Sequence, residues 1–179
     1  MVTIFFESHA TTKDNEEHLA SGHFDAELSA LGVQQAKELG ERNADEEFAA
    51  VFCSDLQRSY RTAKYAFENR HIKIIKDIRL RECDYGEFER QSSEIVDALK
   101  VEHISEPFPG GQSYEQTTAL VKDFLKYLLK NYNGKQVLII GHRATQYALE
   151  NLIIGVPLKE AISAPWEWQP GWVYPLKEI

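Results

Sequence analysis

The chain opens with Val2-Thr3-Ile4-Phe5-Phe6-Glu7-Ser8-His9, a short apolar run that ends at a histidine. The run from Val2 to Phe6 predicts a buried strand, and His9 follows where the strand gives way to a loop. Four further apolar stretches predict strands: Phe48 to Cys53, Ile72 to Ile75, Gln136 to Ile140 and Trp172 to Leu176. A histidine at the end of the first strand is well placed for chemistry, because side chains there project over the edge of a sheet.

Segments with helical periodicity separate these stretches. They run from Ser29 to Arg42 with Ser29 as N-cap, from Asp55 to Phe67, from Tyr114 to Tyr132, and from His142 toward Gly155. Strands alternating with helices predict an α/β fold, a three-layer α/β/α sandwich with a largely parallel central sheet. Ligands of such sheets bind beyond the carboxyl ends of the strands, where His9, Ser54 and His142 all fall.

Size and composition limit the classes of function. The 179 residues are 43% hydrophobic and show no compositional break, so we expect one domain over residues 1–179. The net charge of −8 argues against nucleic acid as a partner. No apolar stretch approaches the roughly 20 residues that cross a bilayer. Cys53 and Cys83 form no zinc or redox pattern, so we predict that both thiols are reduced. Because no signal peptide is expected, we predict a cytoplasmic location.

Four segments carry the chemistry. The first is His9-Ala10-Thr11-Thr12 with Asn15, followed by Asp25, Leu28, Gly32 and Gln35-Ala36. The others are Ser54-Asp55-Leu56-Gln57-Arg58-Ser59-Tyr60-Arg61-Thr62-Ala63, Leu80-Arg81-Glu82-Cys83-Asp84-Tyr85-Gly86, and Gly141-His142. The loop Phe108-Pro109-Gly110-Gly111-Gln112-Ser113 fits the same series. In order and spacing, these segments resemble the histidine phosphatase superfamily, in its phosphoglycerate mutase-like branch.

The resemblance implies a phosphoglycerate mutase-like fold and a metal-independent histidine phosphatase of acid type, with no metal or organic cofactor. The implied reaction is hydrolysis of a small phosphorylated substrate through a phosphohistidine at His9, with Glu82 as the acid and His142 as the second catalytic histidine. Inorganic phosphate is the other expected ligand. Two alternatives are phosphoryl transfer of the phosphoglycerate mutase type, which a chain this short makes less favoured, and a catalytically impaired phospholigand-binding protein.

Elementary chemistry supports the same residues. A neutral imidazole at His9 can attack a phosphoryl centre that carries its own negative charge. The planar guanidinium of Arg58 matches two phosphate oxygens, and His142 and Asn15 can donate to the others. Neighbouring acids would raise the pKa of Glu82 toward what a general acid needs. Arg79 and Arg81 would lower it, so the sequence leaves its protonation open.

The first motif departs from the family signature. The signature reads Arg-His-Gly, whereas this chain has Ser8-His9-Ala10. Ser8 can replace a bidentate charged phosphate contact with one hydrogen bond at best. Ala10 is acceptable if the backbone there does not need a positive φ. Arg143 is the candidate that replaces the missing guanidinium from the opposite strand end, and the alternative is a surface arginine on the first turn of a helix.

Two further stretches are expected to surround the site. The loops between Glu89 and Pro109 are expected to form the rim of the cleft, without a substrate-specific signature. The aromatic segment from Pro165 to Trp172 is expected to anchor the end of the chain to the core. Its alternatives are a wall of the substrate cleft or a contact in a homodimer.

Overall fold

The computed structural model describes residues 1–179 and contains one five-stranded sheet in the order β3-β2-β4-β1-β5. The strands are β1 (Val2–Ser8), β2 (Val51–Cys53), β3 (Ile74–Lys76), β4 (Gln136–Gly141) and β5 (Trp172–Leu176). Four of them run parallel, and β5 pairs antiparallel with β1 at the edge. The largely parallel sheet predicted from the sequence is therefore confirmed.

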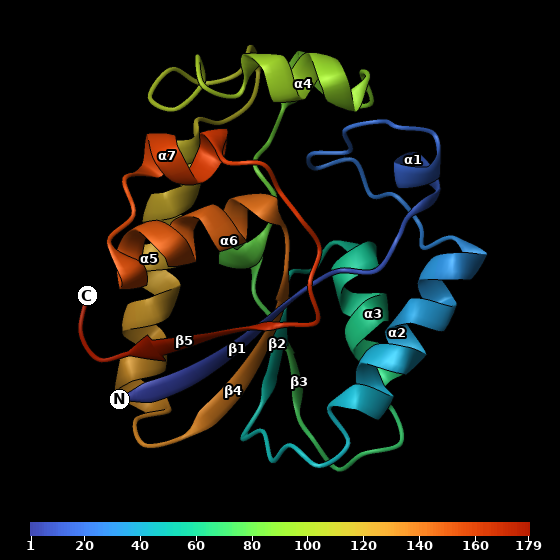
Figure 1. Cartoon of the computed structure of the whole chain (residues 1–179), viewed down its shortest axis with the longest axis vertical. Coiled ribbons are helices and arrows are strands. Elements are labelled where there is room, and N and C mark those ends of the chain that lie inside the picture. Colours follow the sequence, from blue (N-terminus) through green and yellow to red (C-terminus); the bar gives the residue numbers. More distant parts are fainter.

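Helices cover both faces of the sheet (Figure 1). On one side lie α2 (Ala30–Arg42) and α3 (Gln57–Phe67), and on the other lie α5 (Tyr114–Asn131) and α6 (Arg143–Leu149). Ser29 caps α2 as predicted, because its side chain accepts a hydrogen bond from the amide of Gly32 at 3.1 Å. The predicted three-layer α/β/α sandwich is confirmed.

The alternation of side chains along each strand builds the two halves of the core. In β1 the side chains of Val2, Ile4 and Phe6 join the cluster against α5 and α6. In β4, Val137 and Ile139 belong to that same cluster, whereas Leu138 and Ile140 pack toward α2 and α3. Successive residues of a strand face opposite sides, so apolar residues at every position bury both faces of the sheet.

Three short helices, α1 (Lys13–Glu16), α4 (Ser93–Leu99) and α7 (Leu158–Ser163), lie beyond the carboxyl ends of the parallel strands (Figure 1). The loops expected between Glu89 and Pro109 therefore contain a helix, α4, which the sequence analysis missed. Only Val96 of α4 is buried, so its sequence carries too weak an amphipathic pattern to reveal it.

Several predicted boundaries were wrong by a few residues. The strand expected from Phe48 begins only at Val51, because Phe48 is buried in an irregular segment before it. The helix expected from Asp55 starts at Gln57. The helix after His142, in contrast, ends where the sequence predicts: it continues as a π-helical turn (Glu150–Ile154) and stops at Gly155, which has the left-handed φ of 85°. None of the helices is both long and apolar enough to span a membrane.

Candidate active site

Two histidines meet where two neighbouring strands end. His9 follows β1 and His142 follows β4, and these strands place Ser8 opposite Gly141. The amide of His9 donates to the carbonyl of Gly141 at 3.0 Å, and the centres of the two imidazole rings are 5.0 Å apart. The parallel pairing of β1 with β4 thus brings together residues 133 positions apart in the sequence.

The backbone determines which nitrogen of His9 is free. Its Nδ1 lies 2.8 Å from the carbonyl oxygen of Ala10, which can only accept a hydrogen bond, so Nδ1 carries the proton. The lone pair therefore resides on Nε2. Burial and the nearby charges of Arg58 and Arg143 lower the pKa of His9 to about 3, against a smaller opposing effect of the Ala10 carbonyl. His9 is thus a neutral imidazole at physiological pH.

Side chains of α2 and α3 hold the loop after His9 in place. The amide of Ala10 donates to Thr62 Oγ1 at 3.0 Å, and the amide of Thr11 donates to Gln35 Oε1 at 2.9 Å. Ala10 does not have a positive φ, so alanine fits where the family signature has glycine. Thr62 and Gln35 both lie in the motif segments, but their sequence context does not indicate these contacts.

Arg58 is locked in the second position of α3. Its guanidinium donates to the carbonyls of Phe24 at 3.0 Å and Gly22 at 2.7 Å, and the residue is only 2% exposed. These bonds use one N–H group of Nη1 and one of Nη2. Arg58 lines the cleft, so its remaining N–H groups can donate to a ligand there. Burial lowers its pKa, but an arginine stays charged at any physiological pH.

One carboxylate oxygen of Glu82 is bound to the backbone and the other is free. Oε1 accepts the amides of Cys83 at 2.8 Å and Ala144 at 3.2 Å, whereas Oε2 makes no hydrogen bond within the protein. Burial raises the pKa of Glu82, opposed by these two amides and by the charges of Arg58 and Arg143. The sequence left the protonation of Glu82 open between neighbouring acids and the arginines Arg79 and Arg81. In the structure the main cause of its raised pKa is burial, and the arginines that oppose it are Arg58 and Arg143.

His142 is fully buried and has one unpaired nitrogen. Its Nε2 lies 2.7 Å from Ser54 Oγ, and its Nδ1 has no hydrogen-bond partner. Burial, Arg58 and His9 lower its pKa well below the usual value, so the ring is neutral. When the Ser54 hydroxyl donates to Nε2, Nδ1 carries a proton that no group of the protein accepts. His142 lies behind His9 and is not itself one of the residues that line the cleft. Ser54 was noted only as a residue after a strand, and its role as partner of His142 was missed.

Asn15, Ser8 and Arg143 line the same cleft as His9, Arg58 and Glu82. Asn15 in α1 accepts the amide of Thr12 on its Oδ1 at 2.9 Å, which leaves its Nδ2 to donate. The hydroxyl of Ser8 makes one long contact, 3.4 Å to the carbonyl of His9. Arg143 is only loosely paired, with Nη1 at 3.4 and 3.5 Å from the carboxylate oxygens of Asp97. Arg143 is the first residue of α6 and lines the cleft, with 41% of its side chain exposed.

Glu7 does not bring a negative charge into the cleft. Glu7 is a buried residue of β1, and Arg42 donates to its two carboxylate oxygens from Nε at 3.2 Å and from Nη2 at 2.9 Å. Asn43 lies 3.4 Å from the same carboxylate. The charge that follows Phe6 in the sequence is therefore neutralised by a residue of α2.

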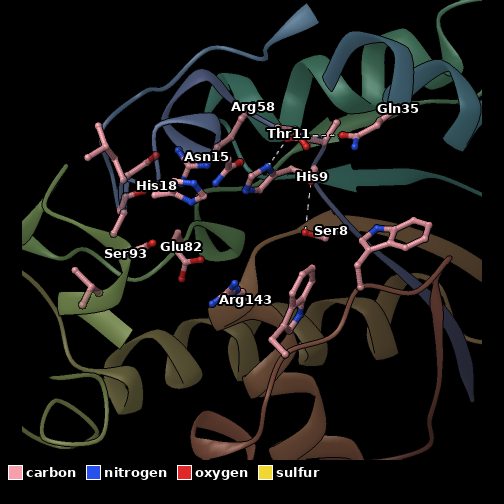
Figure 2. Close-up of a pocket in the computed structure, with 18 of the residues that line it drawn as sticks. Ser8, His9, Thr11, Asn15, His18, Gln35, Arg58, Glu82, Ser93 and Arg143 are labelled. Atoms are coloured by element: carbon pink, nitrogen blue, oxygen red, sulfur yellow. Dashed lines mark hydrogen bonds between the residues drawn. The ribbon is translucent and has the colours of Figure 1, made fainter. Parts of the chain in front are cut away.

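The cleft has a volume of about 600 Å³ and extends to both sides of His9. Figure 2 shows Asn15, His18 and Ser93 gathered on one side of His9 and Gln35 on the other. The predicted rim contributes Ser93, Val96 and Asp97 of α4 to the lining. His18, for which the sequence favours a loop position over one at the edge of the pocket, lies in a loop and also lines the cleft.

The three tryptophans of the aromatic segment after α7 lie in two different places. Trp172 packs on Phe6 with ring centres 5.8 Å apart, which fits the expected anchoring to the core. Trp166 and Trp168 instead line the cleft, as in the alternative interpretation of this segment.

Comparison with known proteins identifies the family. Residues 4–170 match the histidine phosphatase superfamily (branch 1), so the chain belongs to this family. The resemblance drawn from the sequence motifs is thereby confirmed.

Among curated proteins, the chain is 40% identical over 131 residues to the fructose-2,6-bisphosphatase TIGAR of Xenopus tropicalis, covering 68% of this chain and 48% of that protein. The chain thus matches about half the length of this relative. It is 29% identical over 168 residues to phosphoserine phosphatase 1 of Hydrogenobacter thermophilus, covering 89% and 80% of the two chains. The solved structure of YhfR from Bacillus stearothermophilus superposes with a TM-score of 0.85 at 26% identity, covering 97% and 90%.

Proposed function

We propose that this protein hydrolyses phosphate monoesters through a phosphohistidine on Nε2 of His9. The observation that carries the proposal is the pairing, in one cleft, of a neutral imidazole with its Nε2 free and a buried carboxyl with one free oxygen, Glu82 Oε2. A nucleophile and a proton donor with separated pKa values are what phosphoryl transfer to an enzyme requires. Family membership and the phosphatases among its relatives support the same activity.

The reaction has two steps. In the first, His9 Nε2 attacks phosphorus, the ester P–O bond breaks, and protonated Glu82 gives its proton to the leaving oxygen. In the second, the Glu82 carboxylate takes a proton from water as the water oxygen attacks phosphorus. The P–N bond breaks, inorganic phosphate leaves, and His9 and protonated Glu82 are restored. The raised pKa of Glu82 favours the protonated form that starts the cycle.

Four side chains are proposed to bind the phosphoryl oxygens: Arg58, His142 through Nδ1, Asn15 through Nδ2, and Arg143, with a minor contribution from the Ser8 hydroxyl. The buried unpaired Nδ1 of His142 and the spare N–H groups of Arg58 support this assignment. Arg143 supplies a second positive charge, since its partner Asp97 holds it at more than 3.3 Å.

The role of Arg143 is tested by the affinity for inorganic phosphate as a competitive inhibitor. Arg143→Ala removes a charge-assisted bond worth about 1.5–3 kcal/mol, so the inhibition constant should rise roughly 10- to 150-fold. Arg61→Ala, which changes an exposed arginine of α3 outside the cleft, is the matched control and should leave it unchanged. An inhibition constant that is equally unchanged in Arg143→Ala removes Arg143 from the phosphate site.

Hydrolysis of p-nitrophenyl phosphate by the wild type and by His9→Ala tests the activity itself. We expect activity in the wild type and its loss in the variant, whose fold is checked by an unchanged circular dichroism spectrum. Activity that is absent from the wild type, while phosphate still binds, would favour the phospholigand-binding alternative that Ser8 suggests. Interconversion of phosphoglycerate isomers faster than their hydrolysis would favour a mutase.

We also propose a cytoplasmic location, supported by two buried cysteines, Cys53 and Cys83, that remain free thiols. A single domain over residues 1–179 predicts one cooperative unfolding transition in urea. The homodimer considered from the sequence is tested by sedimentation, which would then give a mass twice that of the 20.5 kDa chain.

A further inference from the structure

We infer that the cleft contains a subsite for an uncharged planar aromatic group of the phosphate ester, formed by Trp166 and Trp168. This inference rests on the proposed phosphatase activity and names the class of its substrate.

The size of the cleft calls for a substrate much larger than phosphate. Its volume of about 600 Å³ falls in the range of roughly 300–1,000 Å³ that encloses whole small-molecule ligands. The phosphoryl group occupies only the part next to His9, Arg58 and Glu82. The remaining space must hold the alcohol part of the ester, and its lining therefore determines which alcohols fit.

Both indoles are held in place on the segment between α7 and β5. Trp166 donates from Nε1 to Gln146 Oε1 at 2.8 Å, and the guanidinium of Arg143 lies 4.9 Å from its ring centre. The guanidinium of Arg42 lies 5.8 Å from the ring of Trp168, and Glu7 holds Arg42 with two hydrogen bonds. A hydrogen bond and a cation–π contact from α6 thus hold Trp166, and one cation–π contact from α2 supports Trp168.

The side chain of Trp168 buries little apolar surface in the folded protein. It is 60% exposed although it lines a concave cleft, whereas tryptophan is normally highly buried. An exposed indole at the mouth of a cleft marks a surface on which another planar group can stack. Ser8 lines the same cleft, and its short side chain leaves open the space that an arginine would fill.

The charges on this side of the cleft disfavour an anionic group. Arg42 is neutralised by Glu7, and Glu38 adds a carboxylate that keeps its negative charge while it accepts a hydrogen bond from the side-chain amide of Gln34 at 2.8 Å. Gln35 contributes a neutral amide to the lining. No cation remains here for a second phosphate or a carboxylate, because Arg143 is assigned to the reacting phosphoryl group.

Three esters with the same primary leaving oxygen test the subsite: propyl phosphate, 3-phenylpropyl phosphate and 3-cyclohexylpropyl phosphate. Stacking on an aromatic side chain is worth about 1–3 kcal/mol, so wild-type kcat/KM should be roughly 5- to 150-fold higher for the phenyl ester than for propyl phosphate. The cyclohexyl ester should lie well below the phenyl ester. Trp168→Leu should bring the ratio of phenyl to propyl close to one, and Trp168→Phe should retain most of it.

Binding of the non-hydrolysable 3-phenylpropylphosphonate and propylphosphonate, measured by calorimetry, separates this inference from the proposed activity. Tighter binding of the phenyl compound that is lost in Trp168→Leu supports the subsite, even if no ester is hydrolysed and the proposed activity fails. Equal binding of the two phosphonates overturns the subsite. Hydrolysis of all three esters with equal kcat/KM also overturns it, while leaving the phosphatase proposal in place.

Discussion

Replacing Glu82 with glutamine tests its two proposed roles, as the acid for the leaving oxygen and as the base for water. The structure predicts that this substitution leaves the fold unchanged. A glutamine carbonyl can accept the amides of Cys83 and Ala144 that now bind Oε1, and its amide group takes the place of Oε2. Volume and backbone contacts are kept. What the variant loses is the proton that Oε2 gives to the leaving oxygen and later takes from water.

The size of the loss depends on the leaving group. General acid catalysis contributes roughly 10²–10⁴-fold, so Glu82→Gln should lower kcat/KM for an alkyl phosphate by this factor. The p-nitrophenolate ion leaves without a proton, so kcat/KM for its ester should fall less than about 10-fold. Its kcat should fall more, because water still needs the missing base to release phosphate from His9. The variant should therefore show a burst of p-nitrophenol followed by slow turnover.

Steady-state and stopped-flow kinetics on the two esters measure these effects. Glu115→Gln, which alters an exposed carboxylate at the start of α5, is the control and should change neither rate. An equal fall of kcat/KM for both esters in Glu82→Gln, without a burst, would refute the assignment of Glu82 as proton donor.

Three further predictions concern stability and the second histidine. Ser54→Ala leaves Nε2 of His142 buried without a partner, which should lower the unfolding free energy by about 1–3 kcal/mol and weaken phosphate inhibition; urea titration and inhibition kinetics measure both. His9 has a depressed pKa of about 3 in the fold, so its contribution to stability is present above pH ~6.5 and is lost as the pH falls toward 3. His9→Ala should therefore reduce the slope of unfolding free energy against pH by up to about 1.4 kcal/mol per unit between pH 6 and 4. Gly86→Ala places a methyl group 2.1 Å from the Pro109 carbonyl at a φ of 52°, and calorimetry should show a loss of more than about 1 kcal/mol.

The sequence predicted the features that follow from local patterns. The apolar run from Trp172 to Leu176 has the same bounds as β5, and the run from Gln136 to Ile140 differs from β4 only at its end. Because parallel strands end at one edge of a sheet, the sequence also placed His9 and His142 in one site. In the structure the centres of the two imidazole rings lie 5.0 Å apart.

The features that the sequence did not reveal depend on contacts between distant segments. The carbonyl of Ala10 selects the tautomer of His9 through loop geometry held by Thr62, which lies 52 residues further on. Glu7 is neutralised by Arg42, 35 residues later. No periodicity or spacing encodes such pairings, since they arise only when the sheet and its helices pack together.

The position of the phosphoryl group on the enzyme tests the central claim most directly. Rapid alkaline quenching of Glu82→Gln during turnover of p-nitrophenyl phosphate, followed by mass spectrometry and phosphorus–nitrogen NMR, locates the modified atom. The account predicts one phosphoryl group on Nε2 of His9, because Nδ1 is held by the carbonyl of Ala10. A phosphoryl group on Nδ1 or on another residue, or none during an observed burst, would contradict it.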